Sequence, residues 1–101
     1  MEYELLAAEE IDQIVADLPG WALQADGAAI GKSFHFPTFA AAFGFMSECA
    51  LIAERINHHP EWFNVYNRVD VVLRTHAASG LTTHDVKLAK AMNRAAQRRT
   101  D

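Results

Sequence analysis

The sequence predicts an α+β domain in which three helices pack on one face of a four-stranded antiparallel sheet. Helix-type and strand-type hydrophobic patterns follow one another in the order α-β-β-α-β-β-α. A short turn separates the two strands of each pair, as expected for antiparallel neighbours. The 101 residues, 50% hydrophobic and 22% charged, suit one globular domain that spans residues 1–101.

The first half of the chain predicts a helix and a hairpin. Apolar residues recur with helical spacing through residues 7–18, and a proline–glycine pair ends this helix. Alternating patterns at residues 21–25 and 30–36 indicate two half-buried strands, and an aspartate–glycine pair between them is a strong turn signal. We therefore expect an antiparallel hairpin.

The longest predicted element is a helix from about Thr38 to Asn57. Its first apolar stripe comprises Phe39, Phe43, Met46, Ala50 and Ala53, and its second comprises Phe45, Cys49, Ile52 and Ile56. A helix that is apolar over most of its circumference is buried on more than one side. We expect one side to face the sheet and the other to meet a second subunit, with coverage by the N-terminal helix as the alternative.

The second half predicts another strand pair and a final helix. Strand patterns occupy residues 62–66 and 69–76. Because alternate residues of a strand share a face, His76 is expected at a strand end on the more polar face. Thr82 then resembles a helix N-cap, and Asp85 three residues later completes a capping box.

Composition and charge argue against several functional classes. The formal net charge of −4 gives no general electrostatic reason to bind nucleic acid or an anionic membrane. No apolar run approaches membrane-spanning length, and the N-terminus is acidic where a signal peptide would be basic. The single cysteine, Cys49, cannot form an internal disulfide, so we expect a reducing compartment, most simply the cytoplasm.

Polar groups suited to proton transfer gather around the end of the long helix. Glu54, His58 and His59 precede Pro60, and His76 follows on the next strand pair. Imidazole is the side chain best suited to moving protons near neutral pH. Glu54 and His58 are four residues apart, so they share a face if the helix continues that far. The carboxylate could then orient His58 and favour its protonated form.

Three interpretations of these histidines compete. A metal site would draw on the three histidines, Glu54 and Asp85, but adjacent histidines rarely ligate one ion and no recognised zinc spacing is present. For any one of these residues taken alone, the default interpretation is a purely structural role, with Asp85 as a simple capping acid. Their clustering favours the third interpretation, metal-free general acid–base catalysis. Nucleophilic catalysis is disfavoured because Cys49 lies within an apolar stripe.

A longer pattern resembles a known family. The pattern is Glu54-x3-His58-His59-Pro60-x5-Tyr66-x9-His76-x8-Asp85. It resembles the signature of the pterin-4a-carbinolamine dehydratases, also called dimerization cofactors of the hepatocyte homeodomain factor. The likeness extends to residues 18–21, the hairpin, the phenylalanine-rich helix and residues 80–82, so it covers nearly the whole chain.

The resemblance implies a reaction and its partners. Family members dehydrate 4a-hydroxytetrahydrobiopterin, the product of aromatic amino-acid hydroxylases, to quinonoid dihydropterin and water during tetrahydrobiopterin recycling. The reaction needs a base near N5 and an acid near the 4a-hydroxyl, and it uses neither a metal nor a redox cofactor. The resemblance also implies a pterin substrate, a functional link to a hydroxylase, and a homo-oligomer that is a dimer or a tetramer built from dimers.

The resemblance also assigns roles to residues. His58, His59 and His76 match the catalytic histidines of the family. His58 would be the principal acid/base group, His76 its partner at the departing hydroxyl, and His59 would hold or polarise the pterin. The implied substrate-binding set is Glu54, Pro60, Thr75, Ala77, Ala78 and Asp85. Within it, Glu54 would support His58, and Asp85 would fix the loop that carries His76.

The chain departs from the family pattern after its third histidine. Many members have an acidic or polar residue there, whereas Ala77 and Ala78 follow His76 in this chain, so a side-chain contact with the substrate is lost. Trp62 could stack on the pterin or belong to the core. The alternative function is a non-catalytic oligomeric module that binds or regulates through the long-helix surface, through which some animal members bind a transcription factor.

Overall fold

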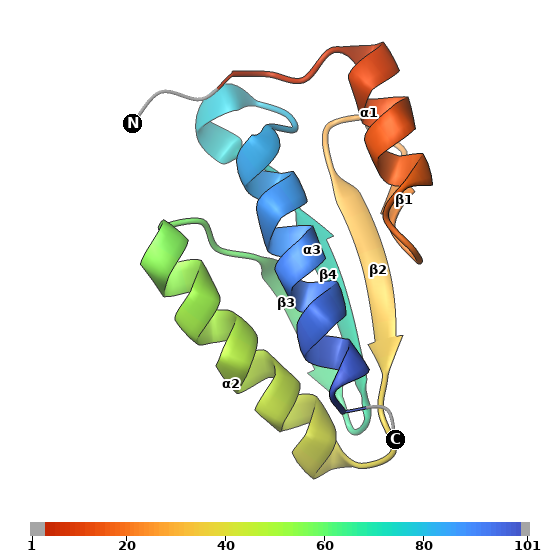
Figure 1. The fold of residues 1–101 in the computed structure, drawn as a ribbon, viewed down its shortest axis with the longest axis vertical. Helices are drawn as coiled ribbons and strands as arrows, with labels where there is room; N and C mark the ends of the chain where they lie inside the picture. Colours follow the sequence, from red (N-terminus) through yellow and green to blue (C-terminus); the bar gives the residue numbers. More distant parts are fainter. Residues whose placement is uncertain (1–3, 100–101) are drawn as a thin grey trace.

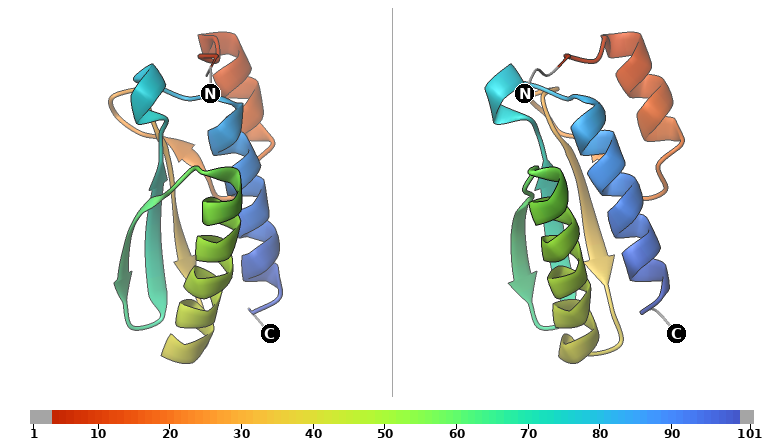
Figure 2. Two further views of the ribbon diagram at one scale, coloured as in Figure 1. Left: turned by 90° about the vertical axis from the view of Figure 1, so that its left-hand side faces the viewer. Right: turned by 60° about the vertical axis from the view of Figure 1, so that its left-hand side comes forward.

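Three helices pack on one face of a four-stranded antiparallel sheet in the computed structural model, which describes residues 4–99 (Figures 1 and 2). The elements are α1 (Ala8–Ala16), β1 (Ala22–Leu23), β2 (Ile30–His35), α2 (Phe39–Ile56), β3 (Glu61–Val65), β4 (Arg68–Leu73), the 3₁₀ turn η1 (His76–Ala78) and α3 (Thr83–Gln97). The predicted class and the order α-β-β-α-β-β-α are confirmed. No helix within residues 4–99 is both long and apolar enough to cross a membrane.

The sheet has the order β1-β2-β4-β3, so its two central strands come from different hairpins. Ile30 pairs with Leu73 and Phe34 pairs with Val69 across these strands. All four side chains are buried beneath the helices, which confirms the alternation predicted for both strands. The predicted hairpin between β1 and β2 is also present.

Helix α2 is buried along one stripe and exposed along another. The buried stripe is Ala42, Phe45, Cys49 and Ala53. Phe39, Phe43 and Leu51 are 49%, 56% and 73% exposed. Helix α1 lies beyond α3 (Figure 1), so the alternative in which the N-terminal helix covers the outer side of the long helix is wrong.

Helix α2 ends immediately before the histidine pair. Asn57 has a left-handed backbone with φ of 52°, and its N–H still donates to the carbonyl of Ala53. The N–H of His58 also donates to the Ala53 carbonyl, at 3.0 Å. A left-handed residue in this position is a common way to end a helix, and asparagine tolerates it better than most residues. The chain therefore turns away from the helix axis before His58.

The last strand ends earlier than predicted. Strand β4 stops at Leu73, and His76 begins the 3₁₀ turn instead of ending the strand. Thr75 and Gly80 form an isolated bridge in which the N–H of each donates to the carbonyl of the other, at 2.9 and 3.4 Å. The chain reverses direction over residues 76–79, between the two bridge residues. The bridge therefore closes a tight loop that contains His76.

Candidate active site

A buried polar cluster connects the segment after α2 with the loop after β4. Its members are His58, Thr75, Thr82 and Asp85, which are between 0% and 6% exposed. Nε2 of His58 lies 2.6 Å from Oδ1 of Asp85. The hydroxyl of Thr75 donates to Oδ2 of Asp85 at 2.8 Å, and the backbone N–H of Thr82 donates to the same oxygen at 3.0 Å. Three donors therefore satisfy one buried carboxylate.

These hydrogen bonds assign the tautomer of His58. An ionised carboxylate only accepts, so Nε2 of His58 carries the proton that lies between it and Asp85. The hydroxyls of Thr75 and Thr82 lie 2.8 Å apart, and Thr82 is the donor because Thr75 gives its own proton to Asp85. The nitrogen of neutral His58 that remains able to accept a proton is Nδ1.

Asp85 holds His58 while it also caps helix α3. Oγ1 of Thr82 accepts from the N–H of His84 at 3.2 Å, and the Asp85 carboxylate accepts from the N–H of Thr82. The predicted capping box is therefore confirmed. Asp85 is more than a simple capping acid, because its other oxygen contacts His58, 27 residues earlier in the chain.

The other two site histidines are exposed, and each pairs with a glutamate. Nε2 of His59 lies 2.7 Å from Oε1 of Glu54, and these side chains are 54% and 79% exposed. Nε2 of His76 lies 3.0 Å from Oε2 of Glu61. Nε of Arg74 lies 3.0 Å from the same oxygen. Exposed ion pairs contribute about 0–1 kcal/mol to stability, so these contacts mainly orient the imidazoles.

The expected pairing of Glu54 with His58 is wrong. The spacing of four residues places two side chains on one face only while the helix continues. Because Asn57 leaves the helical conformation, His58 turns into the interior and Glu54 contacts His59 instead. Asp85 takes the position at His58 that the sequence assigned to Glu54.

Two side-chain links bring the predicted site segments together. Asp85 joins His58 to Thr75, the residue before His76. Glu61, directly after Pro60, contacts His76. The segment 58–61 therefore lies against the segment 75–76. Of the remaining predicted site residues, Pro60 lies directly before β3, and Ala77 and Ala78 lie in η1.

No sequence pattern singled out Glu61, Arg74 or His84 as site residues. Glu61 pairs with Val72 across β3 and β4, so a correct strand register would have brought it near Arg74. The ring of His84 lies 5.7 Å from the ring of His58, a proximity that depends on how α3 packs. Trp62 is half-buried and packs against the hydrophobic core.

Two further groups bear on the possible chemistry. Cys49 is fully buried in the core, and this burial raises the pKa of its thiol to about 12, which makes a thiolate nucleophile unfavourable. Within residues 4–99, no group of three or more histidine, cysteine, aspartate or glutamate side chains is arranged to hold a metal ion.

Comparisons with known sequences point to one family. The family model described as pterin 4 alpha carbinolamine dehydratase matches residues 4–95. A protein from Rhizobium rhizogenes, named provisionally as a pterin-4-alpha-carbinolamine dehydratase, is 63% identical over 101 residues, which are 100% of both chains. A protein from Sinorhizobium fredii with the same provisional name is 58% identical over 95% of this chain and 91% of its own.

Solved structures agree with this result. A transcriptional coactivator/pterin dehydratase from Brucella melitensis has a TM-score of 0.87 and 49% identity, covering 92% of this chain and 99% of its own. A pterin dehydratase-like protein identified as a RuBisCO assembly factor in the alpha-carboxysome has a TM-score of 0.67 over 76% of this chain and 89% of its own. Its 19% identity shows a shared fold alone. The chain belongs to the pterin-4a-carbinolamine dehydratase family.

Proposed function

We propose that the protein dehydrates 4a-hydroxytetrahydrobiopterin to quinonoid dihydropterin and water by histidine general acid–base catalysis. The observation that best supports this reaction is the buried contact between His58 and Asp85 at 2.6 Å, because it holds one imidazole in a single tautomer. Family membership supplies the substrate class. The proposal includes a functional link to the aromatic amino-acid hydroxylase that would form this substrate. It also includes a cytoplasmic location.

The proposed reaction moves two protons and breaks one bond. A base removes the proton on N5, the C4a–O bond breaks as the N5=C4a double bond forms, and the hydroxyl leaves as water. We assign the principal acid/base role to Nδ1 of His58, since its Nε2 is engaged by Asp85. When Nδ1 takes a proton, the Asp85 carboxylate stabilises the resulting imidazolium. Thr75 and the backbone of Thr82 keep that carboxylate in position.

The exposed histidines suit contact with a substrate. His76 is 79% exposed and is oriented by Glu61, so we assign it the delivery of a proton to the departing hydroxyl. His59 would hold or polarise the pterin, and Glu54 would orient His59 in place of its predicted role at His58. Backbone groups of residues 58–60 and 75–78 would line the pterin.

The test compares two histidine substitutions. His58→Ala should lower the dehydration rate about 100-fold, or to the uncatalysed rate if that is reached first, because general acid–base catalysis contributes about 10²–10⁴-fold. His35→Ala is the matched control, since His35 is exposed at the end of β2, away from the site segments. The substrate would be generated by an aromatic amino-acid hydroxylase and followed by absorbance. Full activity in His58→Ala, with unchanged circular dichroism, would contradict the proposal.

Assembly into a homo-oligomer, dimer or tetramer, is supported by the exposed stripe on α2. Phe39, Phe43 and Leu51 leave a large apolar surface uncovered in one chain, which is typical of a subunit interface. Phe43→Glu should reduce the particle size in size-exclusion chromatography while the chain stays folded. The buried Phe45 is unsuitable for this test, because a charge there would disrupt the core.

The same stripe favours the second candidate function, a non-catalytic binding or regulatory module. In that case Phe43→Glu would abolish function, whereas substitution of His58 would leave it intact. The two substitutions together therefore distinguish an enzyme from a module.

A further inference from the structure

Most of the basic side chains have partners within the chain. Of the nine lysines and arginines, Arg68, Arg74, Arg98 and Arg99 lie within ion-pair distance of carboxylates. Lys32 donates hydrogen bonds to Pro19 and Asn93. The remaining cations are Arg55, Lys87, Lys90 and Arg94, which form no ion pair with a carboxylate of residues 4–99. Within residues 4–99, the lysines and arginines without a carboxylate partner are therefore Lys32, whose ammonium donates to neutral oxygens, and these four side chains.

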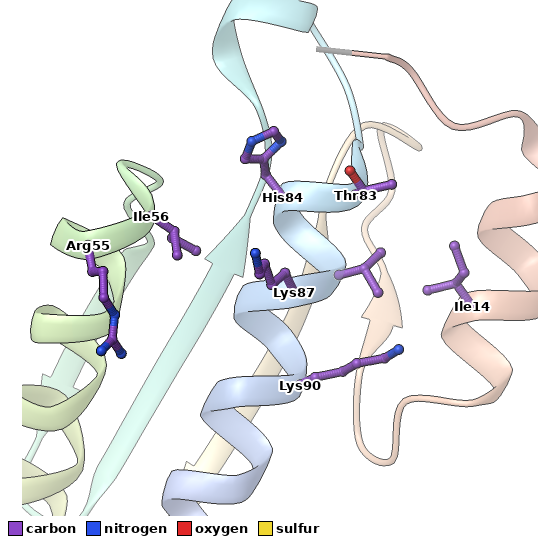
Figure 3. Close-up of a pocket in the computed structure, with 8 residues that line it drawn as sticks. Ile14, Arg55, Ile56, Thr83, His84, Lys87 and Lys90 are labelled. Atoms are coloured by element: carbon purple, nitrogen blue, oxygen red, sulfur yellow. The ribbon is translucent and has the colours of Figure 1, made fainter. Parts of the chain in front are cut away.

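These four cations line one depression on the outer face of the helix layer. A cavity of 760 Å³ is lined in part by Arg55, Lys87 and Lys90. An adjoining cavity of 420 Å³ is lined in part by Arg55, Lys87 and Arg94. We call this continuous depression, bounded by Arg55, Lys87, Lys90 and Arg94, the cationic groove. Figure 3 shows that the N-terminal half of α3 forms its floor, with α2 and Arg55 on one side and α1 on the other.

The cations in the groove repel one another. Lys87 and Lys90 are three residues apart on α3, and Lys90 and Arg94 are four apart, so neighbouring like charges share one helix face. Arg55 adds a further positive charge from α2. In a chain of net charge −4, this concentration is local, and a bound anion would relieve the repulsion.

The groove also has an apolar lining. Ile14 from α1, Ile56 from α2 and Val86 from α3 line the larger cavity. Its volume falls within the range of about 300–1,000 Å³ that is usual for small-molecule sites. A suitable ligand therefore combines several negative charges with an apolar body.

We propose that the cationic groove binds a small organic molecule that carries more than one phosphate group. A phosphate chain is a compact anion of multiple charge, whereas a single carboxylate would neutralise only one of the four cations. The phosphates contact Arg55, Lys87, Lys90 and Arg94, and the organic part packs on the isoleucines and Val86. Neither cavity is lined by His58, His59 or His76, so the groove has a different lining from the proposed dehydratase site. The two border one another at His84, which lines the larger cavity and whose ring lies 5.7 Å from the ring of His58.

ATP is the probe for the test, because it joins a triphosphate to a planar base. Titration into ¹⁵N-labelled protein at low salt should give saturable chemical-shift changes confined to α3, the end of α2 and the part of α1 around Ile14. Lys87→Gln combined with Lys90→Gln should weaken binding at least about tenfold, since each charge-assisted contact is worth roughly a tenfold factor. Lys87→Arg combined with Lys90→Arg should retain binding, because both positive charges remain. Arg68→Gln in β4 is the matched control and should bind like the wild type.

Three results would overturn the proposal. The first is the absence of saturable shifts with ATP, and the second is equal binding by the double glutamine variant and the wild type. The third is tighter binding of a glutamate-rich peptide than of ATP at the same residues, because the groove would then be a protein docking surface. Tripolyphosphate should bind more weakly than ATP, since it lacks the apolar part. The readout is binding alone, so it does not depend on dehydratase activity.

Discussion

Asp85→Asn tests whether the buried carboxylate determines which ring nitrogen of His58 carries the proton. In the native cluster Oδ1 faces Nε2 of His58, and Oδ2 receives the Thr75 hydroxyl and the Thr82 N–H. Asparagine has the same shape but presents one acceptor and one donor. If its oxygen replaces Oδ2, both of those donors stay satisfied and the amide NH₂ faces His58. The ring can accept from that NH₂ only by moving its own proton to Nδ1.

The opposite orientation is less favourable, because the NH₂ would face two donors. We therefore expect the variant to fold with His58 in the reversed tautomer. Exchanging a charge-assisted hydrogen bond for a neutral one should lower the free energy of unfolding by about 1–3 kcal/mol. The effect on catalysis should be larger. With its proton on Nδ1, neutral His58 cannot act as the base, so kcat should fall by about 10²–10⁴-fold or to the uncatalysed rate.

Three measurements check this reasoning. Urea unfolding gives the loss of stability, dehydration of the 4a-hydroxytetrahydropterin gives kcat, and ¹⁵N NMR of the histidine rings reports which nitrogen of His58 is protonated. Asp70→Asn is the control, because Asp70 is a partly exposed carboxylate on β4 that contacts Arg68 and Ser33. It should leave kcat and the His58 tautomer unchanged.

Two outcomes would refute the mechanism. If the tautomer reverses but kcat stays within twofold of wild type, Nδ1 of His58 is not the reacting atom. If kcat collapses while Nε2 stays protonated, Asp85 acts in some way other than by fixing the tautomer.

Four further predictions concern the support of the site and the core. Thr75→Val removes one donor to Asp85, so it should cost about 1–3 kcal/mol in urea unfolding while lowering kcat less than Asp85→Asn does. Asn57→Gly should keep the thermal midpoint near that of wild type, whereas Asn57→Val should lower it, because φ is 52°. Cys49 should resist a thiol reagent at pH 8 until the chain unfolds, because its thiol is buried. Between pH 9.0 and about 12 only the unfolded thiol ionises, so stability should fall with rising pH, with a shallower fall in Cys49→Ala.

The fold and the cap of the last helix were predictable from the sequence because local patterns specify both. Alternate residues of the predicted strand 69–76 share a face, and Val69, Val71 and Leu73 on one such face are all buried. The capping spacing identified Thr82 and Asp85, and the capping box is present. These features depend on periodicity or on a contact between residues three apart, so they can be predicted without knowledge of tertiary packing.

The pairing within the site was not predictable in the same way, because it depends on the backbone of one residue. The sequence placed the end of the long helix only approximately, at about Asn57, and the expected contact between Glu54 and His58 required helix through position 58. Asn57 instead takes the left-handed conformation that asparagine favours at helix ends. That single turn exchanges the partners: Glu54 reaches His59, and His58 enters the interior. A buried imidazole needs a buried partner, and only the packing of α3 against α2 brings Asp85 to it. The sequence therefore proposes the groups of the candidate site, whereas tertiary packing decides which carboxylate each of His58 and His59 contacts.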